Sequence, residues 1–323
     1  MSVPVRSFRR PRLLIIGCGD IGLRVLRLLQ PRWRVLALTS TPQRIPELRA
    51  AGALPLLGDL DDAATLDRLG GLADAVLHLA PPAPEGQSDR RTRNLVHALA
   101  RRGGVGTLVY VGTTGVYGDC RGERVVETRP LAPATERARR RADAEAVLRH
   151  YGRCLEMRVS LLRVPGIYAL DRPGGDPRRR LQSGTPVLRR EDDVYTAHIH
   201  ADDLARACVA ALWHALPQRA LNVADESELR MGEYFDLAAD LLGCPRPPRI
   251  TREQAALQLS SLQLSFMSES RRIDNARLRR ELGLRLRYPS VADGLRPSRI
   301  DESVKPFSGA GVQTAPAPAS SGS

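Results

Sequence analysis

The chain has 323 residues, of which 42% are hydrophobic, so it can bury a sizeable core. No apolar run approaches the roughly 20 residues that span a bilayer, and the basic start contains no signal-peptide core. We therefore expect a cytoplasmic protein without a membrane partner. The formal net charge is +13, but the basic residues are spread over every segment and are not interleaved with aromatics. We therefore expect no nucleic-acid partner either.

The numbers and positions of the cysteines and lysines limit the kinds of site that the chain can form. The cysteines are odd in number, scattered, and never arranged as Cys-x-x-Cys, so we expect neither a metal site nor a disulfide framework. Almost all the basic residues are arginine, and Lys305 is the only lysine.

Short apolar runs alternate with helical patterns along the first half, which is typical of βαβ units and a parallel sheet. We expect strands at 13–16, 35–38, 54–57, 75–79, 107–111 and 160–164, with helices in the intervals. After 165 the pattern loosens. A loop is predicted at 172–180, the start of a helix at 198–203, a further strand at 221–223 and a mostly helical region at 231–296.

The first strand leads into Gly17-Cys18-Gly19-Asp20-Ile21-Gly22, which opens a helix. Gly-x-Gly-x-x-Gly between a strand and a helix is the phosphate-binding turn of dinucleotide-binding proteins. In this interpretation Gly17 permits the tight turn, Gly19 lets the backbone approach a pyrophosphate, and Gly22 lets the helix pack on the strand. The helix N-terminus then offers free N–H groups to the phosphates. A strand–helix turn without a ligand is the competing interpretation.

The end of the second strand bears on which dinucleotide is bound. An NAD-specific site usually has a carboxylate there for the ribose hydroxyls. This chain has Thr39 and Ser40 instead, followed by Arg44, and these side chains could receive a 2′-phosphate. We therefore expect NADP in preference to NAD, although Ser40 or Thr41 could instead cap the next helix.

Together these patterns predict an α/β fold: a doubly wound, Rossmann-type parallel sheet with a smaller, mostly helical C-terminal substrate lobe. We expect a basic N-terminal arm at 1–11, a dinucleotide-binding domain at 12–164 and a substrate lobe at 165–300. Within the lobe, about 194–224 should return to the sheet. Residues 301–323 are dominated by Ser, Gly, Pro and Ala, and we expect them to be disordered.

Several segments together resemble the extended short-chain dehydrogenase/reductase family, the NAD-dependent epimerase/dehydratase group, over about 12–296. They are Tyr110–Gly118, Glu127–Pro133, Arg163–Tyr168, His198–Asp203 and Leu221–Ala224. The resemblance implies a catalytic hydroxyl at Thr113, with Tyr117 beside it. It also implies cofactor contacts from Asp59, Leu60, Leu79, Ala80, Pro81 and Pro165. His198 and His200, taken singly, are expected to be structural.

Two departures from the family pattern affect the expected chemistry. Ile16 stands where the family's spaced glycines would begin, and the family's Tyr-x-x-x-Lys pair is missing. Counting back from Glu145 places Arg137 at the tyrosine position and Arg141 at the lysine position. Arg141 could still hold ribose hydroxyls, but Arg137 stays protonated and is a poor proton-transfer group.

Two hypotheses follow. The first is an NAD(P)-dependent oxidoreductase or epimerase/dehydratase that acts on a small carbonyl or hydroxyl substrate, with Thr113, Tyr117 and Arg141 as its catalytic groups and Tyr168 as a further hydroxyl. The second is a catalytically deficient module that senses NADP(H). The resemblance also implies a homodimer through helices at 90–102 and 135–150, which repulsion between their arginines would weaken.

Overall fold

The computed structural model describes residues 10–296 of the chain. The arm expected at 1–11 lies almost wholly outside these residues, and the tail expected at 301–323 lies wholly outside them. No helix between residues 10 and 296 is long and apolar enough to cross a membrane.

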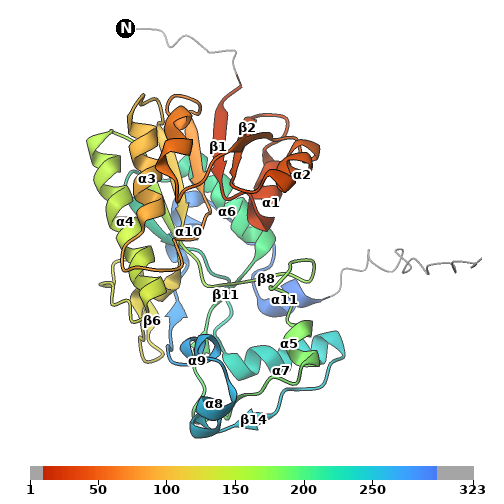
Figure 1. Ribbon diagram of the computed structural model, residues 1–323. Helices are drawn as coiled ribbons and strands as arrows, with labels where there is room; N and C mark the ends of the chain where they lie inside the picture. The colour runs from red at the N-terminus through yellow and green to blue at the C-terminus, as the bar shows by residue number, and fades with distance from the viewer. Residues whose placement is uncertain (1–9, 297–323) are drawn as a thin grey trace, which may run out of the picture.

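One parallel sheet of seven strands forms the centre of the molecule, in the order β12-β7-β5-β4-β1-β2-β3 (Figure 1). Its strands are β1 (Arg12–Ile16), β2 (Arg34–Thr39), β3 (Leu54–Leu57), β4 (Ala75–His78), β5 (Thr107–Val111), β7 (Arg158–Arg163) and β12 (Arg219–Asn222). The strand order reverses between β1 and β4, and doubly wound sheets bind ligands beyond the carboxyl ends of the strands at such a point. The predicted α/β fold is confirmed.

Helices cover both faces of the sheet (Figure 1). One face carries α3 (Arg90–Ala100), α4 (Glu136–Cys154) and the 3₁₀ helix η2 (Ala63–Leu69), and the other carries α1 (Asp20–Leu29), α6 (Ala201–His214) and α10 (Ala276–Leu282). Side chains alternate along β1, so Leu13 and Ile15 join the core under α1 and α6 while Leu14 and Ile16 join the opposite core. Because both faces are buried, the strands are continuous apolar runs.

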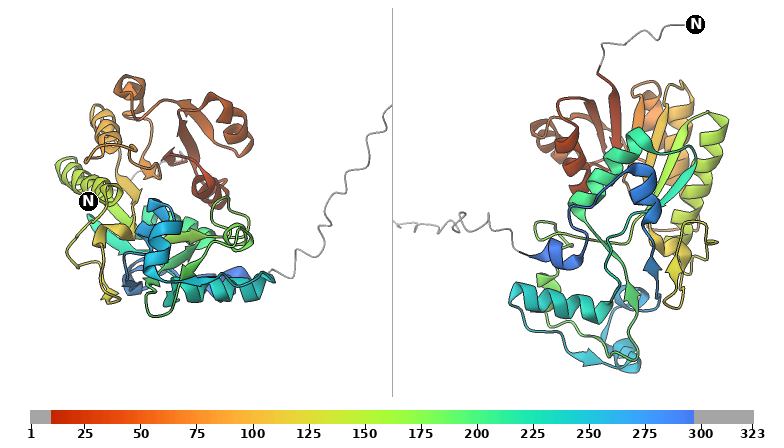
Figure 2. Two further views of the ribbon diagram at one scale, coloured as in Figure 1. Left: turned by 60° about the horizontal axis from the view of Figure 1, so that its bottom comes forward. Right: turned by 180° about the vertical axis from the view of Figure 1, so that it is seen from behind.

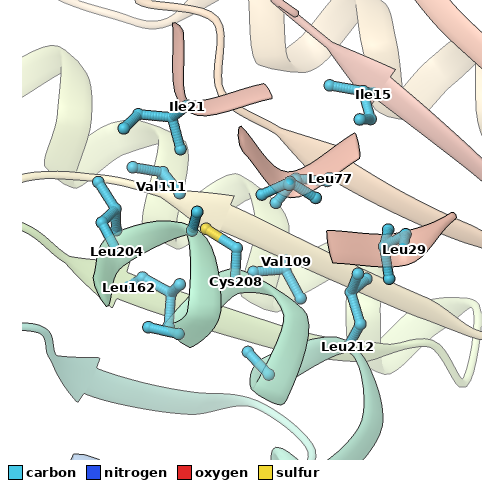
Figure 3. Close-up of a cluster of buried hydrophobic side chains, with 14 of the residues drawn as sticks. Ile15, Ile21, Leu29, Leu77, Val109, Val111, Leu162, Leu204, Cys208 and Leu212 are labelled. Atoms are coloured by element: carbon cyan, nitrogen blue, oxygen red, sulfur yellow. The ribbon is translucent and has the colours of Figure 1, made fainter. Parts of the chain in front are cut away.

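The core under α6 shows how the two layers meet. Cys208 and Leu212 of α6 lie against side chains of the sheet that include Val109 and Leu162 (Figure 3). Cys208 is fully buried, and burial raises the pKa of its thiol to about 12. This cysteine is therefore a neutral core side chain.

The remaining elements are short apart from α7, which has 12 residues. They are η1 (Pro42–Arg44), α2 (Ile45–Ala50), η3 (Thr114–Tyr117), β6 (Arg124–Val125), β8 (Gly166–Tyr168), α5 (Arg178–Gln182), β9 (Val187–Leu188), β10 (Tyr195–Thr196), β11 (His198–His200), β13 (Leu229–Arg230), α7 (Met231–Leu242), β14 (Arg249–Ile250), α8 (Arg252–Gln258), α9 (Ser261–Phe266), β15 (Arg272–Ile273) and α11 (Val291–Leu295). Helices α5, α7, α8 and α9 form a lobe below the carboxyl edge of the sheet (Figure 1).

Within the segment 194–224, α6 packs on one face of the sheet and β12 is its edge strand. Of the strands within 194–224, only β12 enters the central sheet, because β10 pairs with β13 and β11 with β8. Conversely, α10 leaves the predicted lobe and lies beside α6 on the back of the sheet (Figure 2). Its Leu278 and Leu282 are buried in the same core as β1. These long-range contacts have no local sequence signal.

Arginines that were expected to repel across a dimer have partners within the chain. On α3, Arg91 pairs with Asp61 at 2.5 Å and Arg93 with Asp143 of α4 at 2.6 Å. These ion pairs reduce the expected repulsion. The homodimer itself stays a prediction.

A buried ion pair joins the sheet to α4. The side chains of Arg163 and Glu145 are 4% and 3% exposed, and their nearest charged atoms lie 2.7 Å apart. The same guanidinium donates to Tyr117 Oη at 2.9 Å and to the carbonyl of Glu127 at 3.1 Å. Nearly every donor of this buried cation is therefore used inside the protein.

We predict that Glu145→Ala destabilises the protein by about 3–5 kcal/mol, because it leaves the Arg163 guanidinium buried without a counter-ion. The free energy of unfolding, measured by urea denaturation, checks this. The matched control is Asp67→Ala, which breaks the exposed Arg101–Asp67 pair and should cost less than about 1 kcal/mol. Equal losses in the two variants would contradict the prediction.

Candidate functional site

The glycine turn lies between β1 and α1, at the point where the strand order reverses. Gly17 has a φ of +81°, and a Cβ atom there would lie 2.7 Å from the backbone nitrogen of Ala80 at the end of β4. A Cβ atom on Gly22 would lie 2.9 Å from Cys18 Sγ and 3.4 Å from Ile15 Cγ2. Both positions therefore need glycine for the packing of the turn itself.

Gly19 is different, because a Cβ atom at this position would have no neighbour within 4 Å. It is the N-cap of α1, and no side chain caps this end of the helix. The first N–H groups of α1 therefore face open space, as an approaching pyrophosphate requires.

Asp20 turns its carboxylate toward other side chains of the protein. Its two oxygens lie 3.1 Å from Arg24 Nε and 3.1 Å from Arg172 Nε. Arg24 also pairs with Asp171 and Asp202. The Asp20 carboxylate is thus held by two guanidinium groups, of which Arg24 is shared with two further carboxylates. Its backbone N–H remains as the group that it can offer to a phosphate.

A cleft of about 460 Å³ opens in front of the glycine turn. It brings together the following residues predicted from the sequence: Gly17, Gly19, Asp20, Ile21, Gly22, Leu79, Pro81, Thr113, Arg141 and Pro165. Arg137, Arg140 and Arg172 line the same cleft. Arg140 and Arg172 were not predicted as cleft residues, because nothing in the sequence distinguishes them among so many arginines.

The remaining predicted cofactor residues do not line this cleft. Thr39 and Ser40 end β2, whereas Asp59 and Leu60 follow β3, so all four lie at the carboxyl edge of the sheet. Ala80 contributes its backbone beneath Gly17.

Arg44 lies near the glycine turn. Burial raises the pKa of the Cys18 thiol to about 11, and the charge of Arg44 opposes this shift. The Nε atom of Arg44 donates to Glu47 Oε2 at 3.0 Å.

Thr113 lines the cleft in front of the glycine turn, which we call the cofactor cleft, and it also lines a second hollow beside this cleft. Its Oγ1 accepts a hydrogen bond from the backbone N–H of Gly115 at 3.1 Å, which caps η3. A hydroxyl that accepts in this way still has its own hydrogen to donate. Thr113 lines both hollows and can therefore reach a ligand in either.

The two arginines at the Tyr-x-x-x-Lys positions have different surroundings. Arg141 donates to Tyr110 Oη at 3.0 Å and to the carbonyl of Val111 at 3.0 Å, so its guanidinium is fixed at the end of β5. Arg137 makes no ion pair with any described residue and lies over the ring of Phe266 at 5.4 Å.

The structure does not bring the two predicted tyrosines into either hollow. Tyr117 is 1% exposed, and its hydroxyl donates to Asn222 Oδ1 at 2.7 Å while it accepts from Arg163. Tyr168 is also buried and donates to the carbonyl of Ser290 at 3.2 Å. The expectation that Tyr117 acts as a catalytic group is corrected by this position, because η3 turns its side chain into the core.

The second hollow, of about 680 Å³, separates the sheet from the lobe. It shares Thr113, Arg137, Pro165, Ile167 and Arg172 with the cofactor cleft, so the two hollows adjoin. We call it the substrate chamber. Its walls also carry His198, which stacks on Tyr234 at 4.0 Å. Burial lowers the pKa of His198 to about 3, so this ring is neutral at ordinary pH.

Comparison with known proteins agrees with this geometry. A model of the NAD dependent epimerase/dehydratase family matches residues 13–224. The chain belongs to this family. A comparison with curated proteins gave no match.

Solved structures extend the family match to most of the chain. A functionally unknown conserved protein from Silicibacter pomeroyi is 29% identical with a TM-score of 0.74, and the match covers 88% of this chain and 96% of that one. A putative NAD-dependent epimerase/dehydratase from Methylobacillus flagellatus is 26% identical with a TM-score of 0.68, over the same shares. A dTDP-glucose 4,6-dehydratase from Streptomyces venezuelae is 24% identical with a TM-score of 0.71, over 88% and 94%, and shares the fold.

We predict that Gly19→Val abolishes NADH and NADPH binding and leaves the melting temperature unchanged. The new side chain would enter open space in front of α1, where this epimerase/dehydratase fold places the pyrophosphate, and would displace no protein atom. Calorimetric titration and a thermal melt check the two effects.

Gly22→Val is the matched control. It should lower the melting temperature, because a Cβ atom at this position meets Cys18 and Ile15 within the protein. A Gly19→Val variant that binds either dinucleotide as tightly as the parent would place the cofactor elsewhere.

Proposed function

We propose that the protein is an NAD(P)-dependent oxidoreductase or epimerase-type enzyme that acts on a small carbonyl or hydroxyl substrate. The observation that carries this proposal is that the two hollows adjoin. The cofactor cleft and the substrate chamber have lining residues in common, and Thr113 is one of them. A ligand in the chamber can thus meet the end of a dinucleotide that starts at the glycine turn.

The residues present fit a dinucleotide. The open space at Gly19 and the uncapped N-terminus of α1 suit the pyrophosphate. Arg141 and Pro165 line the same cleft, and Pro165 also lines the chamber. When bound there, the nicotinamide would supply or accept a hydride, and every other role falls to side chains of the chain.

Thr113 would position the substrate, and Arg141 would contact the cofactor. Thr113 would donate its free hydroxyl hydrogen to the substrate oxygen and so hold it in place. Arg141 would keep a positive charge at the end of β5 and contact the ribose hydroxyls. In the part of the chain that the structure describes, no Tyr-x-x-x-Lys pair is present, so solvent in the open chamber would supply the proton.

A sensor without turnover is the second candidate. It is favoured by the burial of Tyr117 and Tyr168, since neither phenol can exchange a proton with a ligand in the chamber. Oxidation of NADPH by any member of a broad carbonyl panel would support the enzyme. Tight NADPH binding without turnover over the whole panel would support the sensor.

Cellular location and oligomeric state belong to the same proposal. We place the protein in the cytoplasm, and the five free cysteines support a reducing compartment. Its partners would be a small-molecule substrate and a second copy of the chain.

We predict that NADPH binds at least roughly tenfold more tightly than NADH, because Thr39, Ser40 and Arg44 offer donors to a 2′-phosphate where an NAD-specific site has a carboxylate. Side-by-side calorimetric titration of the two dinucleotides measures this preference. Arg44→Gln should lower the affinity for NADPH and leave that for NADH unchanged. Equal affinities of the parent protein would refute the preference.

We predict that Thr113→Val lowers turnover by on the order of 10²-fold with little change in NADPH affinity, because the variant keeps the shape and loses the hydroxyl. Steady-state kinetics with the best substrate of the carbonyl panel measures the loss. Thr113→Ser restores the hydroxyl and should recover most of the rate. Undiminished turnover in Thr113→Val would exclude this residue from the reaction.

A further inference from the structure

The substrate chamber is unusually rich in positive charge. Four arginines line it, Arg137, Arg172, Arg180 and Arg271, whereas Glu269 is the only carboxylate among its described lining residues. Arg271 pairs with Glu269 at 2.6 Å, and Arg172 pairs with Asp20. Two of the four cations therefore have a counter-ion within the protein.

Arg137 and Arg180 form no ion pair with a described residue, although the charge of Glu269 acts on Arg137 from a longer distance. Arg137 lies over the Phe266 ring at 5.4 Å, and Arg180 lies over the Phe235 ring at 4.5 Å. The only other polar contact that the structure gives Arg180 is a hydrogen bond of 3.3 Å to the carbonyl of Pro186. Burial lowers the pKa of both guanidinium groups, in agreement with cations that are partly desolvated and unpaired.

A desolvated cation without a counter-ion is costly unless a ligand supplies the missing charge. Elsewhere in the described chain, buried arginines such as Arg24 and Arg163 have carboxylate partners. Arg141 and Arg149 also lack a carboxylate partner, but both donate to backbone carbonyls, and Arg149 lines neither hollow. The Nε atom of Arg180, in contrast, is buried without a hydrogen-bond partner. Arg137 and Arg180 line the same chamber, and both lie over aromatic rings of its wall, which hold their guanidinium groups in position. Arg180 is half-buried, and Arg137 is exposed to the open chamber.

We propose that the substrate of this chamber is an anion whose carboxylate or phosphate group pairs with Arg137 and Arg180. The inference rests on the proposed function for the nature of the chamber and adds the chemical class of the substrate. Arg137 occupies the position of the family's proton-transfer tyrosine. In this chain that position would therefore select and hold the substrate by its charge.

Pairs of carbonyl compounds that differ in charge test the proposal. One pair is pyruvate and its methyl ester, and the other is dihydroxyacetone phosphate and dihydroxyacetone. Inorganic phosphate and acetate serve as minimal anions. Calorimetric titration of the full-length protein, with and without NADPH, gives the dissociation constant of each ligand. The pyruvate pair reports on a carboxylate and the dihydroxyacetone pair on a phosphate.

We expect at least one anion to bind about tenfold or more tightly than its neutral partner. Arg137→Gln and Arg180→Gln should each reduce this preference by about tenfold. Arg139→Gln is the matched control, because Arg139 is an exposed arginine of the same helix whose guanidinium bonds only to the carbonyl of Ala134. It should keep the full preference for the anion.

Two outcomes would overturn the proposal. One is a parent protein that binds none of the anions more tightly than the neutral compounds. The other is a preference that survives in both Arg137→Gln and Arg180→Gln. Failure of the proposed function is seen separately, because a parent that does not bind NADPH loses that function while the titrations without NADPH still decide the anion site.

Discussion

Arg24 holds the glycine turn, the lobe and α6 in one arrangement. Its side chain is 7% exposed and pairs with Asp20 of the turn, Asp171 of the lobe and Asp202 at the start of α6. Burial alone would lower the pKa of Arg24, but hydrogen bonds with Asp171 and Asp202 outweigh it and raise the pKa. Because these three segments border the site, its geometry depends on this single buried cation.

The same network explains how a phosphate-binding turn can contain an aspartate. A free carboxylate at Asp20 would repel a pyrophosphate that approaches Gly19, but Arg24 and Arg172 hold this carboxylate and offset part of its charge. Arg172 also lines both hollows. The turn, the cofactor cleft and the substrate chamber are therefore electrostatically connected, and a change of charge in one would be felt in the others.

The sheet could be predicted from the sequence because the information lies within short segments. A strand buried on both faces is an apolar run, and the glycine turn is recognised by the strand before it and the helix after it. The position of α10 could not be predicted, since Leu278 and Leu282 fit any apolar surface and only the tertiary fold places them against α6.

The site could likewise be predicted only in part: the residues at strand ends were predicted, and those placed by the tertiary fold were not. Residues at strand ends, such as Thr113 and Pro165, lie where the pattern places them. Tyr117 does not, because η3 redirects the chain directly after Thr113 and the phenol finds polar partners in the core. The role of Arg180 was hidden for another reason. In a chain so rich in arginine, only the tertiary structure tells which of them lack a carboxylate.

The exchange of Tyr-x-x-x-Lys for Arg137 and Arg141 changes what the site can do. A phenol and an ammonium can pass a proton, whereas two guanidinium groups stay charged at every working pH. The two guanidinium groups instead place fixed positive charge in the cofactor cleft, and Arg137 also places it in the substrate chamber. Arg141 is fixed by Tyr110 and Val111, and Arg137 projects from the same helix without a counter-ion. In the proposed enzyme, Arg137 would thus stand at the position expected for the proton-transfer group and would attract negative charge instead.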